Sequence, residues 1–377
     1  MVTRRTEAVA DGPQALRPDA LALPWLAPVL EQTLRTHQGH ALLVCGSAGA
    51  GALEFVLRLS QAWLCEHASA DPAASDAAGA RLQAIAGRPC GHCGSCRLFL
   101  AHTHPDFRLR VPEALAVAQG WPVQVDERRK PSRQIRIEEV RQAIDWMSTT
   151  SGRGQGKVLA LHPVEAMNAA SASALLKTLE EPPRGARLVL STADPALLMP
   201  TIRSRCQLLR LAPPPRPIAL QWLQSHGVVD ANILLDGAGG MPLTALQWSQ
   251  EGLTASAWAS VPQAVARGDA SAFGGWPVPR VLDAFQKLCH DAGATQLGGS
   301  ARFFPAAQLP AGASLERLTL WFKSLQRVMR HAEHPWSEPL LLEALVAEGR
   351  SVWEAPAKRR AARGSSASER VSRDLEA

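Results

Sequence analysis

Four of the seven cysteines in the chain have the spacing of a metal-binding module. Cys90, Cys93 and Cys96 stand in PCGHCGSC, where two overlapping C-x-x-C steps place three thiols on one tight turn. Cys65 can supply a fourth ligand, because it ends the helical pattern that follows a glycine-rich stretch. Thiolates in tetrahedral geometry suit Zn²⁺, and four protein ligands make such a site structural rather than catalytic. The sequence therefore predicts a structural zinc site at these four cysteines.

Other uses of these residues stay open on the sequence alone. His92, His102 and His104 are rivals of Cys65 for the fourth ligand position. Disulfides are the competing account, but they are rare in cytoplasmic proteins, and a redox C-x-x-C pair would leave the third close cysteine unexplained. The other cysteines are expected to be small core residues: Cys45, Cys206 and Cys289.

The stretch LLVCGSAGAGALEF has the outline of a phosphate-binding loop. Gly46 and Gly51 keep the glycine spacing of G-x-x-x-x-G-K-[ST], with Gly49 between them, but Ala52 and Leu53 replace the lysine and the hydroxyl residue. A methyl group and an isobutyl group cannot neutralise a triphosphate or coordinate Mg²⁺. We therefore expect a nucleotide-binding fold without ATPase chemistry. A glycine-rich turn without nucleotide ancestry is the alternative on this stretch alone.

Strands and helices that would position these residues alternate along the first half of the chain. Apolar strand patterns stand at LLV, KVLALH, ARLVLST and QLLRL, and amphipathic helical patterns stand at 25–34 and 168–181. IRIEEVRQAIDWM, at 135–147, has the pattern of a strand end that leads into an amphipathic helix. This alternation predicts an α/β fold with a mainly parallel sheet. Only helical patterns follow Pro213–Pro215, with RLTLWFKSLQRVMRH the clearest. The Ala-rich segment at 67–80 and the stretch 111–132 are expected to be loops.

Composition indicates a globular protein of more than one domain. The chain has 377 residues, of which 46% are hydrophobic and 20% charged. No apolar run is long enough to span a bilayer, and the N-terminus lacks the apolar block of a secretory signal, so a cytoplasmic location without membrane contact is expected. The net charge is +6, but the tail 355–377 holds six Lys or Arg against three acidic residues. Net charge therefore does not establish nucleic-acid binding by the body of the protein.

Further motifs, taken together and in order, resemble one known family. HALLVCGSAGAG, CGHCGSC with Cys65, THPDF, SALLKTLEEPP, STADPALLMPTIRSRC and LAPPP match the delta prime family of bacterial DNA polymerase III clamp-loader subunits, which belong to the AAA+ class. The resemblance covers about 21–353 and is strongest up to Pro215. LLKTLEEPP and SRC are shared with the ATP-hydrolysing sibling subunits, so the loss of ATPase residues selects the delta prime family.

The resemblance implies three such losses. Ala52 and Leu53 replace the loop residues of the siblings, His162-Pro163-Val164-Glu165 stands where an Asp-Glu pair organises Mg²⁺, and Leu243 replaces a nucleotide-sensing Arg. The resemblance also gives Arg205 a role as an arginine finger that acts in trans on the ATP of a neighbouring subunit. Arg203 is a weaker candidate for the same surface and Lys177 a candidate for the subunit interface, but the default expectation for both is a solvent-facing side chain.

The implied fold is an α/β AAA+ domain with a zinc knuckle, followed by a helical lid and an all-α collar. We expect these parts to be a flexible N-terminus at 1–20, the α/β domain at 21–212 with its zinc module at 65–96, the lid at 213–251, the collar at 252–354, and a disordered basic tail at 355–377. The implied function is that of a structural stator in the clamp-loader heteropentamer, within the polymerase holoenzyme, without ATPase or polymerase activity of its own.

The implied partners are the gamma/tau ATPase subunits and the delta subunit, with the sliding clamp and primed DNA reached through the complex. The implied cofactor is structural Zn²⁺, with no functional ATP site. An active AAA+ ATPase and a zinc-knuckle nucleic-acid-binding module are the alternatives from other classes. The first predicts ATP hydrolysis by the chain alone, and the second predicts salt-dependent DNA affinity.

Overall fold

The computed structural model describes residues 22–67, 87–123, 129–330 and 337–354. By its internal contacts the chain divides into two compact units, Met1–Ala255 and Ser256–Ala377. The expected flexible N-terminus at 1–20, the Ala-rich segment after His67 and the basic tail at 355–377 lie outside the described residues. Within the described ranges, no helix combines the length and the apolar character needed to cross a membrane.

The first unit is built on a five-stranded sheet in the order β2-β3-β4-β1-β5, and every neighbouring pair is parallel. This confirms the predicted parallel α/β architecture. The strands are β1 (Ala41–Cys45), β2 (Phe107–Arg110), β3 (Lys157–Leu161), β4 (Ala186–Thr192) and β5 (Gln207–Arg210). The helices of this unit are α2 (Ala27–Thr36), α3 (Ala52–Leu64), α5 (Gly94–Leu100), α6 (Glu113–Ala118), α7 (Ile137–Met147), α8 (Ala169–Glu180), α9 (Pro200–Arg203), α10 (Arg216–Ser225), α11 (Ala231–Gly237) and α12 (Pro242–Gln250).

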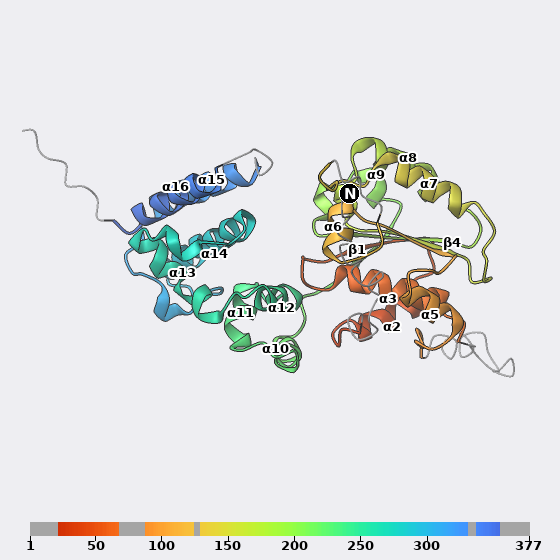
Figure 1. Ribbon diagram of the computed structural model, residues 1–377, viewed down its shortest axis with the longest axis horizontal. Coiled ribbons are helices and arrows are strands. Elements are labelled where there is room, and N and C mark those ends of the chain that lie inside the picture. Colours follow the sequence, from red (N-terminus) through yellow and green to blue (C-terminus); the bar gives the residue numbers. More distant parts are fainter. Residues whose placement is uncertain (1–21, 68–86, 124–128, 331–336, 355–377) are drawn as a thin grey trace, which may run out of the picture. The chain divides into compact units, whose positions relative to one another are not determined.

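Helices cover both faces of the sheet, with α7, α8 and α9 on one face and α2, α3 and α5 on the other (Figure 1). Successive residues of a strand point to opposite faces, so each buried strand feeds two cores. In β1, Leu42 and Val44 pack with α3, whereas Leu43 packs with the α7 and α8 side. The near-continuous apolar runs of β1, β3 and β4 follow from this two-sided burial.

The stretch 111–132 was expected to be a loop, and that expectation was wrong in part. Helix α6 occupies Glu113–Ala118, while residues 124–128 lie outside the described ranges. Charged residues in this stretch do not mark a loop, because they form ion pairs. Glu113 is buried and accepts hydrogen bonds from Arg129 at 2.8 and 2.7 Å and from the Ser132 backbone at 2.9 Å. Arg129 chiefly, together with the Ser132 N–H, lowers the pKa of Glu113 to about 2.

The described residues of the second unit form only helices and short 3₁₀ turns. Its α-helices are α13 (Ala255–Arg267, which begins at the unit boundary), α14 (Val278–Gln296), α15 (Leu315–Arg330) and α16 (Glu338–Ser351), and the 3₁₀ turns of both units are Val164–Ala166, Pro195–Leu197, Ala270–Phe273 and Ala306–Gln308. Gly349 lets α16 approach α13 and α15 closely. A Cβ at this position would lie 2.6 Å from both Val265 of α13 and Trp321 of α15.

A buried carboxylate fixes the loop that follows α14. Asp291 is fully buried and accepts three backbone N–H hydrogen bonds, from Arg302 at 2.9 Å, Phe303 at 2.7 Å and Phe304 at 2.9 Å. A buried N–H group without a partner costs about 1–3 kcal/mol, so the loop depends on this one side chain.

Replacing Asp291 by Ala should therefore destabilise the second unit by roughly 3 kcal/mol, because three N–H groups lose their acceptor. Hydrogen–deuterium exchange of the full chain should show lost protection at residues 302–304. Asp283→Asn is the matched control, since it breaks only a partly exposed ion pair within α14. Unchanged protection at 302–304 in the Asp291 variant would show that the loop is held by other contacts.

Candidate functional site

The structure brings the four predicted cysteines together. Their sulfur atoms lie within 4.8 Å of one another, with 4.0 Å between Cys65 and Cys93 and 3.9 Å between Cys90 and Cys96. Four sulfurs at about 2.3 Å from one Zn²⁺ in a tetrahedron are about 3.8 Å apart. Cys65 caps the C-terminus of α3, and Cys93 caps the N-terminus of α5. The four side chains therefore have the arrangement of a tetrahedral thiolate site that could hold a metal ion.

Backbone N–H groups point at these sulfurs, as a thiolate site requires. The amides of Cys93 and Cys96 donate to the sulfurs of Cys90 and Cys93, at 3.3 and 3.4 Å. Burial raises the pKa of Cys65 and of Cys96. Burial acts in the same direction on Cys90, but backbone donors outweigh it and lower its pKa to about 6. Cys65 and Cys96 would therefore ionise only if a cation bound beside them, and four thiolates this close fit a divalent metal.

The structure shows which of the histidines near the cysteine cluster could bind a metal. His104 is buried with both ring nitrogens engaged, since Nδ1 accepts from the Asp106 amide at 3.0 Å and Nε2 bonds to Ser95 Oγ at 2.9 Å. It therefore has no lone pair to offer a metal. His92 lies beside the cluster and belongs to a second group with Cys90 and His67. Of the other cysteines, Cys45 and Cys289 are buried, as expected of core residues, and Cys206 is half-buried.

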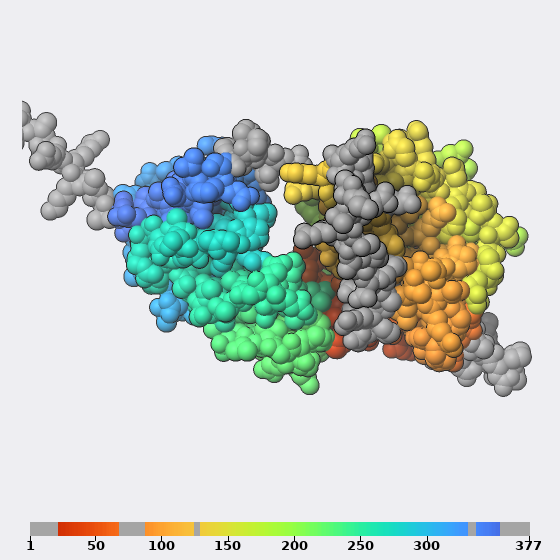
Figure 2. Space-filling view, viewed as in Figure 1, coloured from red at the N-terminus to blue at the C-terminus, as the bar shows by residue number. Residues whose placement is uncertain are grey.

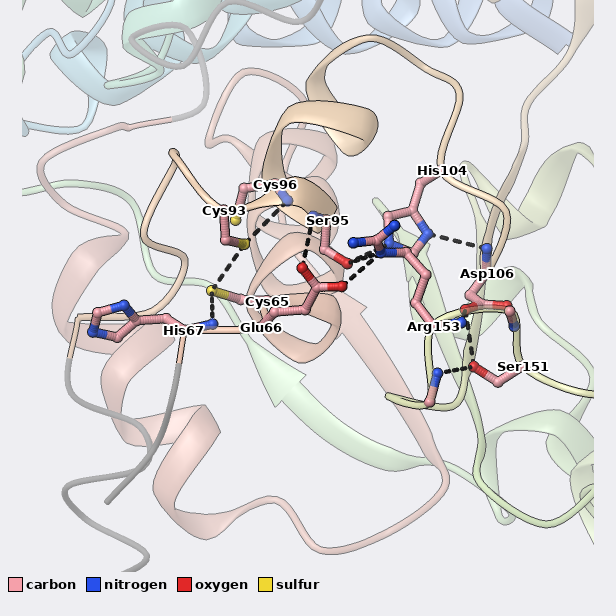
Figure 3. A network of polar contacts seen from close by, with 12 residues as sticks. Cys65, Glu66, His67, Cys93, Ser95, Cys96, His104, Asp106, Ser151 and Arg153 are labelled. Carbon is pink, nitrogen blue, oxygen red and sulfur yellow. Dashed lines mark hydrogen bonds and ion pairs between the residues drawn. The ribbon is translucent and has the colours of Figure 1, made fainter. Parts of the chain in front are cut away.

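A polar network joins the cysteine cluster to the loop before β3 (Figure 3). Glu66, next to Cys65, accepts from Arg153 at 2.6 Å and from the Ser95 amide at 3.2 Å. Arg153 chiefly lowers the pKa of Glu66 to about 2. The buried Asp106 accepts from Ser151 at 2.8 Å and from the amides of residues 152 and 153 at 2.7 and 2.8 Å. The cluster is thereby tied to the sheet.

Helix α12 packs directly on the glycine loop. Gly49 has φ +83°, and a Cβ there would lie 2.1 Å from Thr244 Oγ1 and 3.0 Å from Met241 Cβ. The Leu243 amide donates to the Gly49 carbonyl at 3.3 Å, and the Leu243 side chain packs on the core beside α3. An anion that contacted the loop at Gly49 would therefore have to displace Thr244.

Other parts of the first unit fill the remainder of the loop. Gly51 has φ +99°, and a Cβ there would lie 2.8 Å from Leu23 and 3.0 Å from Leu26. The Trp25 indole N–H donates to the Ala50 carbonyl at 2.9 Å, in a buried hydrogen bond. The Gly46 amide, one donor that could bind a phosphate, bonds instead to the Thr192 carbonyl at 3.1 Å. Protein groups thus occupy the space and some of the donors that a phosphate group would need.

Residues after β3 are also engaged within the protein. His162 bonds through Nδ1 to Ser191 Oγ at 2.7 Å, and burial lowers its pKa to about 4, which keeps the ring neutral. Glu165 Oε1 accepts from the Ala193 amide at 2.9 Å. These side chains therefore support the carboxyl edge of the sheet, where an ATPase would organise Mg²⁺.

Arg205 follows the short helix α9 and is partly exposed. Its guanidinium donates to the Thr201 carbonyl at 2.8 Å and forms an ion pair with Glu180, the last residue of α8. Arg203, two residues earlier, is exposed and donates to the Pro195 carbonyl at 3.3 Å. Lys177 is also exposed. Arg205 is therefore a charge on the surface of the first unit whose direction is set by Glu180.

Sequence reasoning missed several residues of these sites. His104 and Asp106 stand in the recognised THPDF motif, but only their partners Ser95 and Ser151 reveal what they do. Glu180 stands in LLKTLEE, where its charge signalled no particular partner. Thr244 carried no signal, because its contact with Gly49 depends on how α12 packs in three dimensions.

The family model matches the first part of the chain, and the curated relatives match a little over half of it. The family model described as "DNA polymerase III, delta subunit" matches residues 26–215. The delta prime subunit of DNA polymerase III from Escherichia coli K12 is 32% identical over 56% of this chain and 55% of its own length. The subunit of the same name from Pseudomonas aeruginosa is 34% identical over 61% of this chain and 62% of its own length. The match thus spans little more than half of each relative.

Among solved structures, a DNA polymerase III gamma subunit-related protein from Thermotoga maritima covers 87% of this chain and 99% of its own, at 14% identity and a TM-score of 0.42. That likeness is too loose to carry an argument. The family model covers the α/β half, which holds the cysteine cluster, the altered glycine loop and Arg205. The chain therefore belongs to this family, that of the DNA polymerase III delta prime subunits.

Proposed function

We propose that this chain is a non-hydrolysing, structural subunit of a DNA polymerase III clamp loader. The observation that carries the proposal is the filled glycine loop, which lacks the phosphate-binding Lys and packs against Thr244 and Leu23. Residues 21–212 form an AAA+-like domain with a zinc module at 65–96. Residues 213–251 form a lid, and 252–354 form a helical collar that joins the chain to its partners.

The partners in this proposal are the gamma/tau ATPase subunits and the delta subunit, in the cytoplasm. The complex loads the sliding clamp on primed DNA with ATP that is bound elsewhere. Because α12 and the segment before α2 both pack on the loop, nucleotide does not drive motion of the lid against the sheet in this chain. Such a subunit holds its shape while its neighbours cycle, which is the property of a stator.

In this proposal, Arg205 is the residue through which the chain promotes ATP hydrolysis in a neighbouring subunit. Its guanidinium is always charged and planar, and it would stabilise charge that develops on the γ-phosphate of ATP held by a neighbouring subunit. Support comes from its partial exposure and from Glu180 and Thr201, which orient it without burying it. An enzyme site in the neighbour is thus completed by a chain that lacks one.

The cysteine cluster holds one structural Zn²⁺ in this proposal. Cys65, Cys90, Cys93 and Cys96 supply all four ligands, so the ion has no open position for catalysis. Bound metal would neutralise the thiolates and join the end of α3 to the knuckle. Through Glu66 and Arg153 it would also support the loop before β3.

The filled loop can be tested by restoring the missing lysine. Ala52→Lys restores the phosphate-binding Lys, yet the variant should show no ATP affinity in isothermal titration calorimetry, because Thr244, Leu23 and Leu26 occupy the loop. Ala52→Met is the control for a long side chain, with thermal unfolding to check that both variants fold. ATP binding by the Lys variant would mean that only the charge was missing, and it would favour a relic that still binds nucleotide.

Arg205→Ala should reduce the DNA- and clamp-stimulated ATP turnover of the complex reconstituted with the sibling subunits. Loss of an arginine finger costs about 10³–10⁵ in rate at the site it serves. Arg203→Ala is the matched control and should turn over ATP like the wild type, since it removes a nearby exposed guanidinium. Equal assembly of all three complexes is checked by co-elution. Normal turnover by an equally assembled Arg205→Ala complex would remove the finger role.

The metal proposal predicts that the purified chain contains about one equivalent of Zn²⁺ by elemental analysis. Cys96→Ser should lose the metal, and hydrogen exchange should then rise in 90–106, because the thiolate cluster no longer holds the knuckle. Cys206→Ser, a half-buried cysteine outside the cluster, should keep the full metal content. A wild-type chain without metal, or a Cys96 variant that retains it, would contradict the assignment.

A further inference from the structure

A second group of metal-ligating side chains adjoins the four cysteines. His67, Cys90 and His92 each offer one ligand atom, and these atoms lie within 4.8 Å of one another. Both histidines are exposed and Cys90 is partly so, and the knuckle segment lies at the surface of the first unit (orange in Figure 2). The group shares Cys90 with the four-cysteine cluster, but it is more open to solvent, because two of the four cysteines are buried whereas both histidines are exposed.

The two imidazoles are held side by side by their backbones. The ring centroids of His67 and His92 are 5.9 Å apart with the planes nearly perpendicular. Arg88 donates to the His67 carbonyl at 3.0 Å, and Arg97 donates to the His92 carbonyl at 2.8 Å. The His67 amide also bonds to the sulfur of Cys65 at 3.4 Å. The rings therefore meet because backbone groups of His67 and His92 are themselves held by hydrogen bonds.

Hydrogen bonding also selects a metal-binding tautomer of His92. Its Nδ1 lies 2.9 Å from the Cys90 carbonyl, which can only accept, so Nδ1 carries the proton and Nε2 keeps its lone pair. Histidine ligands in proteins commonly donate their other ring N–H to a backbone carbonyl in this way. Adjacent ligands of a tetrahedral Zn²⁺ are about 3.3–3.8 Å apart, which exposed side chains within 4.8 Å can reach by small rotations.

Charge favours a cation at this place. Four thiolates around one Zn²⁺ carry two more negative charges than the ion neutralises, and Cys90 extends that charge toward the histidines. This step rests on the structural zinc proposed above, whereas the ligand geometry does not. Two imidazoles and a thiolate suit borderline cations such as Zn²⁺, Co²⁺ and Ni²⁺ rather than Mg²⁺ or Ca²⁺.

We propose that His67, Cys90 and His92 form a second, solvent-open site for a borderline divalent transition-metal ion, with Cys90 bridging to the structural zinc. The ion takes its fourth ligand from solvent, so it exchanges more readily than the enclosed one. It links His67, beyond the end of α3, to the knuckle.

The test is a Co²⁺ titration of the full-length, tag-free chain that already contains its zinc. Wild type should take up about one further equivalent and show thiolate-to-cobalt charge-transfer absorption, because Cys90 is a ligand. The variant His67→Ala/His92→Ala should bind this equivalent at least about tenfold more weakly while it keeps its zinc. His226→Ala, an exposed histidine on α10's C-terminal side, is the matched control and should behave as wild type.

Three results would overturn the second site: no cobalt uptake by wild type, equal uptake by the double variant, or uptake matched by release of zinc. The structural zinc is judged separately, from the metal content before titration. If the chain contains no zinc, that proposal fails, and titration of the metal-free wild type against the double variant still decides the histidine site.

Discussion

At Gly49 the backbone of the glycine loop touches the N-terminus of α12, in space that even a methyl group would overfill. This contact fixes the first unit's α10–α12 segment against the carboxyl edge of the sheet. Trp25 reinforces it, because its indole bonds to Ala50 while its ring meets Trp222 of α10 edge-on at 5.3 Å. In an ATPase a nucleotide would lie between loop and lid, and its loss would change their separation. Here the packing is continuous, so the two parts stay together without a ligand.

Helix α3 connects this loop to the cysteine cluster. It begins at Ala52, next to the last loop glycine, and ends where Cys65 turns toward the knuckle. Its 13 residues make a rod of about 20 Å, and ten of them are buried. Because the helix is largely buried and packed at both ends, a shift of the loop would move the end of the helix at Cys65 with it. Without the phosphate-binding side chains, the loop still has a structural task, which is to anchor the helix that ends at Cys65.

The sequence revealed those features whose cause is local. C-x-x-C spacing places three thiols on one turn whatever surrounds them, and the buried runs of β1 and β3 follow from a parallel sheet with two covered faces. Strand β2 escaped notice because FRLR has only two apolar residues. Helix α6 escaped notice because it has only six residues and a stretch with prolines and charges follows it. Among those charged residues, Arg129 forms an ion pair with Glu113, which lies 16 residues earlier in the sequence. Likewise, no local pattern could reveal that Glu180 turns toward Arg205, or that both nitrogens of His104 are engaged.

The ion pair between Arg205 and Glu180 is compatible with a role for Arg205 in trans. Both side chains are partly exposed, at 32% and 50%, and pairs of this kind contribute only about 0–1 kcal/mol. A triphosphate concentrates several negative charges in a partly desolvated interface, and it competes for the guanidinium with charge-assisted, bidentate hydrogen bonds. Glu180 therefore orients Arg205 in the free chain without holding it back. Thr201 accepts from the same guanidinium through a backbone carbonyl, so the arginine is already ordered in the free chain. In the proposed role in trans, this order would lower the entropic cost of binding.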